Sequence, residues 1–324
     1  MKIHKIFAVV SVAALLLYSV PAAYAQQKKA KKITNYNDMI ASYNKGNKKV
    51  ALDIALSFKE GKNGAAIDVS NALEWLDKAF NAGIYRAATI AGTMYYKGDG
   101  VKQDFRTAEQ YYRKAASKGN EDAMIHLGYM YYNGYGLQTS YASAKSWYGK
   151  AVRKYEKSNK CSIGCKYYAD ICYFSSSTEP DYEPDYAEAL KWYEKAFAAG
   201  YMEVSVKLAS LTYQLNSAGN ANASSEKAIK FLFDAAGKGY VPAMEALAEG
   251  FMTGKYGKRD MINAYAWSSL LLARGFNNTD VNNVRQTAER NMNDEQKKKA
   301  QKSADALIKK LVEAVYLESN GNLD

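Results

Sequence analysis

The hydrophobic pattern of this chain repeats at intervals close to 36 residues. Six small residues are each followed three positions later by an aromatic side chain, and successive small residues lie 36, 36, 45, 39 and 36 positions apart. The small residues are Ala72, Ala108, Ala144, Ala189, Ala228 and Ala264, and the aromatic residues are Trp75, Tyr111, Trp147, Trp192, Phe231 and Trp267. All 4 Trp of the chain share this register. Repetition at this period predicts an array of supersecondary units rather than one conventional domain.

The clearest unit, residues 87–119, predicts two helices joined by a turn. Ala87, Ala91 and Tyr95 recur at helical spacing before Gly98, which can take the left-handed conformation that ends a helix. Asp104 then precedes a second helical pattern, and aspartate is favoured at the N-cap. One such hairpin cannot bury its apolar face alone, so neighbouring hairpins are expected to stack into a solenoid.

Glycine inside the first helix of a unit indicates that another part of the chain packs closely against that helix. Gly92 and Gly128 each cost about 1 kcal/mol of helix propensity relative to alanine. We therefore expect them to let two backbones approach, with Ala108 and Ala144 as the facing small residues.

At these positions the sequence resembles the Sel-one-like repeat (SLR) family, a relative of the tetratricopeptide repeats. The residues that carry the signature in the third copy are Ala123, Leu127, Gly128, Tyr131, Gly134, Gly136, Ala144, Trp147, Tyr148, Lys150 and Ala151. The resemblance implies an all-α fold, a right-handed α/α solenoid of about six helix-turn-helix repeats with a C-terminal capping helix.

The first residues have the three-part pattern of a secretory signal peptide. Lys2 and Lys5 precede an apolar run at 6–20, and small residues follow up to an expected cleavage site near Ala25. The run is shorter than the roughly 20 residues that a membrane span needs. We therefore expect an exported protein, periplasmic or secreted after cleavage, that is not integral to the membrane.

The leader and the repeats divide the chain into four expected regions. These are a signal peptide at 1–25, a basic tail with an N-terminal capping helix at 26–49, six SLR units at 50–276, and C-terminal capping helices at 277–324. The six units are expected at about 50–84, 87–120, 123–158, 165–201, 204–240 and 243–276.

The charge adds information on partners. The chain has a formal net charge of +11 and a mean hydropathy of -0.42. A basic exported protein suits anionic surfaces, which include cell-wall polymers and acidic proteins. Nucleic acid is not expected as a partner in that compartment.

Three cysteines lie close together in the least regular part of the repeat array. Cys161 and Cys165 can close a small disulfide loop if Cys161 lies outside the helix that holds Cys165, and Cys172 would then remain free. The alternative is that all three are buried, unbonded small hydrophobic residues. His126 is the only histidine after the leader, so a zinc site is not expected. The carboxylates Glu179, Asp181, Glu183 and Asp185 offer oxygen ligands for a hard cation, but two prolines interrupt them and they lack EF-hand spacing, which favours a solvated helix entry. We therefore expect neither a metal nor a cofactor.

Motifs for catalysis are weak. Ser42 with Lys45 and Ser224 with Lys227 fit the Ser-x-x-Lys spacing of penicillin-binding enzymes, but the chain has neither Lys-Thr-Gly nor Ser-Asp-Asn. We therefore expect a non-enzymatic protein. A β-lactam-binding or cell-wall hydrolase-like SLR protein is the alternative from another class.

Resemblance to tetratricopeptide repeats implies that first helices line a concave, partner-binding face. Its candidate residues are Arg86, Tyr96, Tyr129, Tyr132, Phe174, Tyr213 and Met252. The alternative is that these aromatic rings pack between neighbouring hairpins. The leading functional hypothesis is a scaffold for a protein or peptide partner in the cell envelope, and a cell-wall glycan-binding module is a further alternative.

Overall fold

The computed structural model describes residues 35–157, 160–174, 182–219 and 224–320, and every regular element within them is helical. The expected signal peptide at 1–25 and most of the basic tail lie outside these residues. In the part of the chain that the structure describes, no helix has the length and apolar character needed to cross a membrane.

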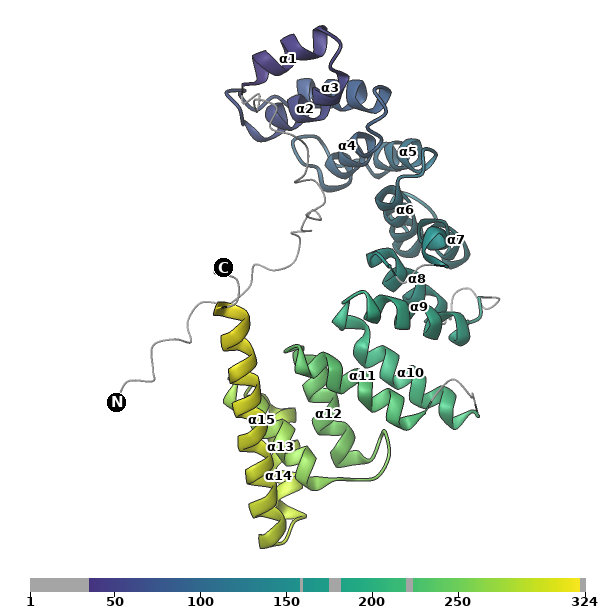
Figure 1. Ribbon diagram of the computed structural model, residues 1–324. Helices are drawn as coiled ribbons and strands as arrows, with labels where there is room; N and C mark the ends of the chain where they lie inside the picture. The colour runs from purple at the N-terminus through teal and green to yellow at the C-terminus, as the bar shows by residue number, and fades with distance from the viewer. Residues whose placement is uncertain (1–34, 158–159, 175–181, 220–223, 321–324) are drawn as a thin grey trace. The chain divides into compact units, whose positions relative to one another are not determined.

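The helices follow one another with short connections (Figure 1). The first seven are α1 (Tyr36–Asn44), α2 (Ala51–Glu60), α3 (Val69–Asn81), α4 (Arg86–Lys97), α5 (Phe105–Ala116), α6 (Glu121–Asn133) and α7 (Tyr141–Val152). The next are α8 (Ile163–Tyr173), α9 (Tyr186–Ala198), α10 (Ser205–Ser217), α11 (Ser225–Gly237), α12 (Val241–Thr253), α13 (Met261–Ala273), α14 (Thr279–Arg290) and α15 (Asp294–Asn320). Short 3-10 helices lie at Lys48–Val50, Arg153–Tyr155 and Met202–Val204.

Short polar side chains begin most of these helices. Each accepts a hydrogen bond from a backbone N–H of the first turn, which satisfies a donor that has no partner inside the helix. The capping residues are Asn35, Asp104, Asn120, Ser140, Ser162, Asp185, Ser224, Asp260 and Asn278.

Helices α4 and α5 form the hairpin that the pattern at 87–119 predicts. α4 ends at Gly98, whose φ of 73° is left-handed and whose N–H donates to the carbonyl of Met94. α5 begins after Asp104, whose carboxylate accepts from the N–H groups of Arg106 and Thr107. Local residue chemistry therefore determines both ends of the turn.

The chain divides into two compact units, Met1–Trp75 and Leu76–Asp324. In the first unit α1 packs on α2, with the rings of Tyr36 and Phe58 5.3 Å apart. The Tyr43 ring meets Trp75 edge-on at 4.9 Å. These contacts give the first unit its own small apolar core.

The second unit is an all-α solenoid. Each helix from α4 to α13 packs against the next along the chain, and α14 and α15 both pack on α13 (Figure 1). The first helices of successive hairpins also touch, α4 with α6, α6 with α8, and α10 with α12. We call the surface made by α4, α6, α8, α10 and α12 the first-helix face.

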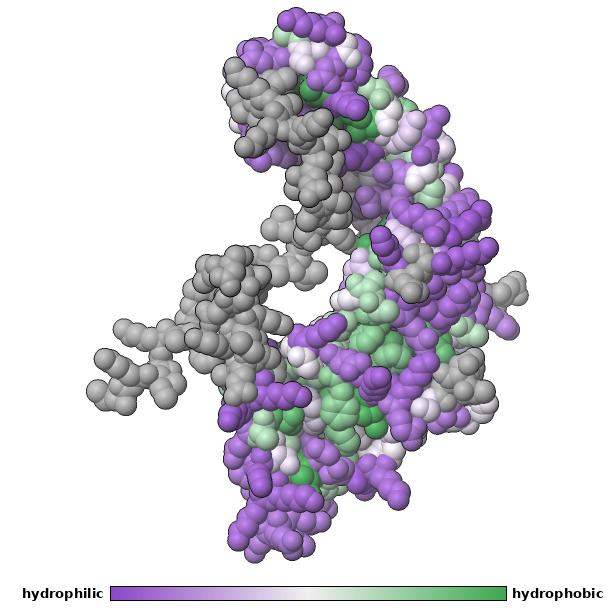
Figure 2. Space-filling model, viewed as in Figure 1, coloured by the Kyte–Doolittle hydropathy of each residue, from purple (hydrophilic) through white to green (hydrophobic). Residues whose placement is uncertain are grey.

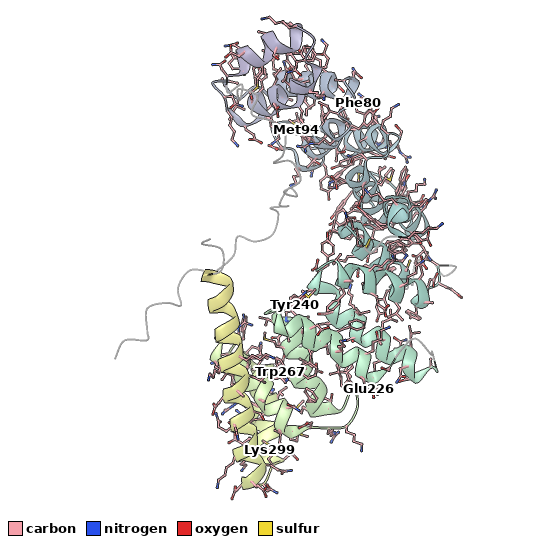
Figure 3. All side chains as sticks on the ribbon, in the orientation of Figure 1. Phe80, Met94, Glu226, Tyr240, Trp267 and Lys299 are labelled. Carbon is pink, nitrogen blue, oxygen red and sulfur yellow. A yellow bond between two sulfur atoms is a disulfide. The ribbon has the colours of Figure 1, made fainter. Side chains whose placement is uncertain are left out.

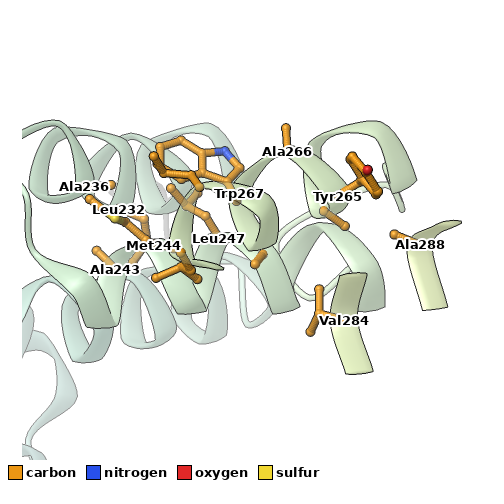
Figure 4. Packing of buried hydrophobic residues seen from close by; sticks show 14 of the residues in the cluster. Leu232, Ala236, Ala243, Met244, Leu247, Tyr265, Ala266, Trp267, Val284 and Ala288 are labelled. Atoms are coloured by element: carbon orange, nitrogen blue, oxygen red, sulfur yellow. The ribbon is translucent and has the colours of Figure 1, made fainter. Parts of the chain in front are cut away.

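The core of the second unit follows the repeat register. The small residues that precede each aromatic side chain are fully buried where helices cross, and they are Ala108, Ala144, Ala189, Ala228 and Ala264. Trp267 packs near Leu232 and Leu247 at the C-terminal end of the array (Figure 4). Glu226 and Lys299 lie on the surface instead (Figure 3).

The glycines inside the first helices make room for tyrosine rings and, at Gly92, also for the expected backbone neighbour, since a Cβ there would lie 3.1 Å from the Ala108 carbonyl oxygen. A Cβ at Gly128 would lie 2.6 Å from Tyr148 Cε1, and one at Gly92 would lie 2.8 Å from Tyr112 Cδ1. Ala144 is not among the nearest neighbours of Gly128. The glycines therefore make room chiefly for tyrosine rings from the second helix, because a flat ring needs the space that a Cβ would occupy.

Candidate functional site

The first-helix face contains an open cleft of about 360 Å³ between α6, α8 and α10. Six of its nine lining side chains are aromatic. The lining residues are Tyr129, Tyr132, Tyr148, Tyr167, Asp170, Ile171, Tyr173, Phe174 and Lys207. We call this opening the aromatic cleft, and its volume is in the usual range for a ligand pocket.

The rings of the aromatic cleft hold one another in place. Tyr148 rises from α7 beneath Gly128 and stacks on Tyr167 of α8, with ring centroids 5.7 Å apart and planes 14° apart. Tyr132 meets Phe174 edge-on at 5.4 Å. Tyr129 remains 39% exposed at the rim. The cleft therefore has a fixed floor and an accessible edge.

One carboxylate, Asp170, makes all the charged contacts of the cleft. It accepts from Lys166 Nζ at 2.8 Å, from Lys207 Nζ at 2.6 Å and from the Tyr193 hydroxyl at 2.6 Å. Burial acts to raise the pKa of Asp170, but the two ammonium groups and the phenol outweigh it and the pKa is lowered. Asp170 is thus a fully partnered anion that joins α8, α9 and α10.

Three phenols of the cleft, those of Tyr129, Tyr132 and Tyr148, keep their protons at neutral pH and can donate hydrogen bonds. Burial raises the pKa of Tyr148, and nearby Tyr167 and Asp170 add to the shift. Burial also raises the pKa of Tyr132 and Tyr129. Neutral phenols and ring faces suit the binding of apolar and hydrogen-bonding groups.

Five segments of the chain match the family model described as Sel1 repeat, at residues 51–84, 85–120, 121–154, 163–201 and 241–275. They cover more than half of the sequence. The chain belongs to the Sel1 repeat family. Sel1 repeats generally mediate protein–protein interaction, and proteins built from them are typically non-catalytic scaffolds.

Two solved structures are similar to this chain, and the first of them shows the same fold. The crystal structure of a Sel1 repeat protein from Oxalobacter formigenes is 23% identical, with a TM-score of 0.58, over 74% of this chain and 93% of that one. A second is c5321, a protective antigen of uropathogenic Escherichia coli strains with an SLR fold, at 20% identity and a TM-score of 0.40, over 88% of this chain and 82% of that one. No curated protein matches the chain.

The Sel1 repeat brings together three of the residues expected on the concave face. Tyr129, Tyr132 and Phe174 line the aromatic cleft. Tyr96 instead packs against Phe105 at 5.4 Å, within the same hairpin.

The remaining candidates also lie away from the cleft. Tyr213 meets Tyr256 edge-on at 5.8 Å, and Met252 is half-buried against the C-terminal core. Arg86 is exposed at the start of α4.

The repeat pattern did not reveal Tyr148, Tyr167, Asp170 and Lys207 as cleft residues. Tyr148 belongs to a second helix, and the same register holds Tyr112 and Tyr193 in the neighbouring copies, so it resembles ordinary core. A usable signal is the glycine 20 residues earlier, because Gly128 shows that a ring passes under α6.

Two of the three cysteines lie at the start of α8, and the third lies near its end. Cys161 and Cys165 form a disulfide with Cα atoms 6.1 Å apart, and Cys161 precedes the helix, which begins at Ile163. Cys172 is free and buried, and burial raises the pKa of its thiol to about 12. A protonated buried thiol is a poor nucleophile.

The histidine and serine motifs have structural partners. His126 stacks on Tyr112 with ring centroids 4.7 Å apart, and burial lowers its pKa to about 4, with Lys97 contributing. Ser224 is the N-cap of α11, and Lys227 Nζ lies 2.7 Å from Glu194 rather than serving the serine hydroxyl. The Ser42 hydroxyl accepts from Asn47 Nδ2 at 3.1 Å.

Proposed function

We propose that this chain is an exported, non-enzymatic Sel1 repeat scaffold that binds a protein or peptide partner of the cell envelope at the aromatic cleft. The observation that carries the proposal is an opening of about 360 Å³ lined by six aromatic side chains on the first-helix face. The export part rests on the leader pattern at 1–25.

The cleft has the properties of a peptide-binding surface. Tyrosine rings offer a large contact area with few rotatable bonds, so little conformational entropy is lost when a partner binds. The Tyr148 and Tyr167 rings are already stacked, and Asp170 is already paired, so neither must reorganise to admit a ligand. Preorganisation of this kind lowers the free-energy cost of association.

The geometry favours an apolar or aromatic anchor side chain on the partner. Rings from α6 and α8 surround the opening, and the polar groups at its edge are phenols and the Asp170–Lys207 pair. If a side chain of the partner fills the opening, the partner's backbone lies near these phenols and charged groups, which can hydrogen-bond to it. This is the usual arrangement of a peptide anchor.

The test is affinity capture from the cell-envelope fraction with four forms of the protein. These are the wild type, Tyr129→Ala, a Tyr129→Ala/Tyr132→Ala double variant, and Tyr85→Ala as the matched control. Tyr85 is 39% exposed, the same as Tyr129, but does not line the cleft. Circular dichroism verifies that each variant is folded before capture.

The proposal predicts a protein that the wild type and Tyr85→Ala retain and that the two cleft variants lose. Retention of that protein by all four forms would place the interface elsewhere. Retention of wall polymer without a protein, weakening as salt rises, would instead indicate a glycan-binding module.

A further inference from the structure

A second groove, of about 540 Å³, lies between the second helices α5 and α7 and away from the aromatic cleft. Its lining holds three cationic side chains, one indole ring and no carboxylate. The lining residues are Arg113, Ala116, Ser117, Met124, Trp147, Lys150 and Arg153. Hydrophilic residues dominate the surface over α7 in Figure 2. We call this opening the basic groove.

Arg113 is held in one orientation inside the basic groove. Its Nε donates to Glu109 at 2.6 Å and its Nη2 donates to the Tyr131 hydroxyl at 2.6 Å. The guanidinium also lies 5.7 Å from the centroid of Trp147. A fixed planar guanidinium retains donors that can bind a carboxylate with little loss of side-chain entropy.

Among the residues that the structure describes, the other two cations of the groove have no carboxylate partner. Lys150 Nζ lies 4.0 Å from the Trp147 ring centroid, and both Lys150 and Arg153 are exposed. Across the described ranges of the chain, no Asp or Glu pairs with either of them. Neighbouring Lys154 differs, because it reaches Glu121 at 2.6 Å.

The corresponding groove between α9 and α11 is a built-in comparison. Its lining contains Lys191, Lys195, Lys227 and also Glu194. There Lys227 pairs with Glu194 at 2.7 Å and Lys191 pairs with Glu156 at 3.1 Å. The same repeat geometry therefore gives one groove whose cations have acidic partners and one groove where two cations do not.

We propose that the basic groove is a second binding site, and that its ligand is an acidic peptide segment with an apolar side chain between its carboxylates. The charge complementarity rests on Lys150 and Arg153, which have no acidic partner among the described residues, with Arg113, already paired with Glu109, as a third cation in the lining. Trp147 and Met124 also line the groove, and they favour an apolar side chain on the ligand.

A peptide explains this lining better than a uniformly hydrophilic polyanion does. An indole face and a methionine thioether gain binding free energy from apolar contact, which a phosphate polymer does not offer. Arg113 and Arg153 present guanidinium groups that match carboxylates in a bidentate geometry. An acidic segment with one leucine-like side chain uses both features.

The experiment measures binding of a rhodamine-labelled peptide, Asp-Glu-Leu-Asp-Glu, by fluorescence anisotropy. The variants are Lys150→Gln/Arg153→Gln, Trp147→Leu, and a charge-matched control, Lys230→Gln/Lys238→Gln. Lys230 and Lys238 are exposed on and after α11 and do not line the basic groove. Unlabelled inorganic polyphosphate and the uncharged peptide Asn-Gln-Leu-Asn-Gln serve as competitors.

The groove variant Lys150→Gln/Arg153→Gln is expected to weaken peptide binding by about tenfold or more, while the control changes it by less than about twofold. Trp147→Leu should weaken binding of the leucine peptide, and it should not change binding of a peptide that has glycine in place of the leucine. Equal binding by the groove variant and the control would overturn the site. The peptide assignment would be overturned in favour of a polyanion by three results together. Polyphosphate would displace the peptide from the wild type, its own binding would not change in Trp147→Leu, and peptide binding would not depend on the leucine.

Discussion

The first-helix face of the second unit is open in its middle and filled near its C-terminal end. In the middle, Tyr148 and its neighbours enclose the aromatic cleft of about 360 Å³. Near α12, the Tyr256 ring packs so closely on Gly250 that a Cβ at this glycine would lie 2.7 Å from the ring. The cavity that remains beside the ring has a volume of only about 20 Å³. The Tyr256 hydroxyl reaches Ser210 of α10 at 3.3 Å.

The two regions also differ in the segment that supplies one tyrosine ring. In the third hairpin the ring comes from the second helix as Tyr148. In the last hairpin that register holds Ser268, which is buried and donates to the Ala264 carbonyl, and Tyr256 from the turn supplies the ring. The same repeat thus makes a cleft or a filled core without a change of backbone fold.

The largest effect is expected where the face is filled. Tyr256→Ala should lower the free energy of unfolding by about 3–5 kcal/mol, because it removes a buried ring that packs between α10 and α12. Urea titration followed by circular dichroism measures it. A loss below about 1 kcal/mol would mean that the two regions do not differ in packing.

The next effect tests a stacked pair of rings one hairpin earlier, Tyr112 and His126. Burial lowers the pKa of His126 to about 4, below the unfolded value near 6.5. The unfolded state therefore binds the proton first, so stability is complete above pH 6.5 and falls by about 2–3 kcal/mol as the pH drops to 4.

His126→Phe keeps the stacking on Tyr112 and removes the titrating group. Its unfolding free energy should lose that part of the pH dependence between 6.5 and 4, while carboxylates still titrate in both proteins. Parallel pH profiles for wild type and variant would show that His126 is solvated and that this pair is as open as the cleft.

A smaller effect is expected from two glycine substitutions. Gly128→Ala should cost about 1–3 kcal/mol, because its Cβ would overlap the Tyr148 ring at 2.6 Å. Gly237→Ala, in a helix with open space around the site, should be neutral or stabilise by up to about 1 kcal/mol. Thermal unfolding of both proteins checks the sign, and equal shifts would contradict the ring-packing explanation.

The smallest change in stability is expected at the rim of the cleft. Tyr129→Ala should alter the unfolding free energy by no more than about 1 kcal/mol, since the residue is 39% exposed at the rim. Chemical denaturation measures this directly. A loss as large as that of Tyr256→Ala would show that Tyr129 is core and not a binding residue.

The fold was largely predictable from the sequence, because its signals are local. Gly98 and Asp104 predict a turn because one favours the end of a helix and the other the start of the next. The alanine-to-aromatic spacing predicts the repeat. The cleft was predictable only at Tyr129, Tyr132 and Phe174.

The rest of the site depends on which rings meet, and the spacing of a single hairpin does not contain that information. Tyr96, Tyr132 and Tyr213 share one register, and each packs on a ring from a helix start or a turn, namely Phe105, Tyr141 and Tyr256. The register alone therefore does not tell which of the three lines an opening. Lys207 of α10 donates to Asp170 of α8, which belongs to the preceding hairpin. This pair could be found only after the hairpins were placed next to one another.

The most direct test of the central claim is photo-crosslinking in cells, with benzoylphenylalanine in place of Tyr129 or, as the control, Tyr85. Both positions are equally exposed, so a difference reports on binding rather than on access. The account predicts one discrete protein adduct at position 129 that is absent at position 85 and is lost when Tyr132→Ala is added. Adducts of equal yield at both positions, or none at 129, would contradict it.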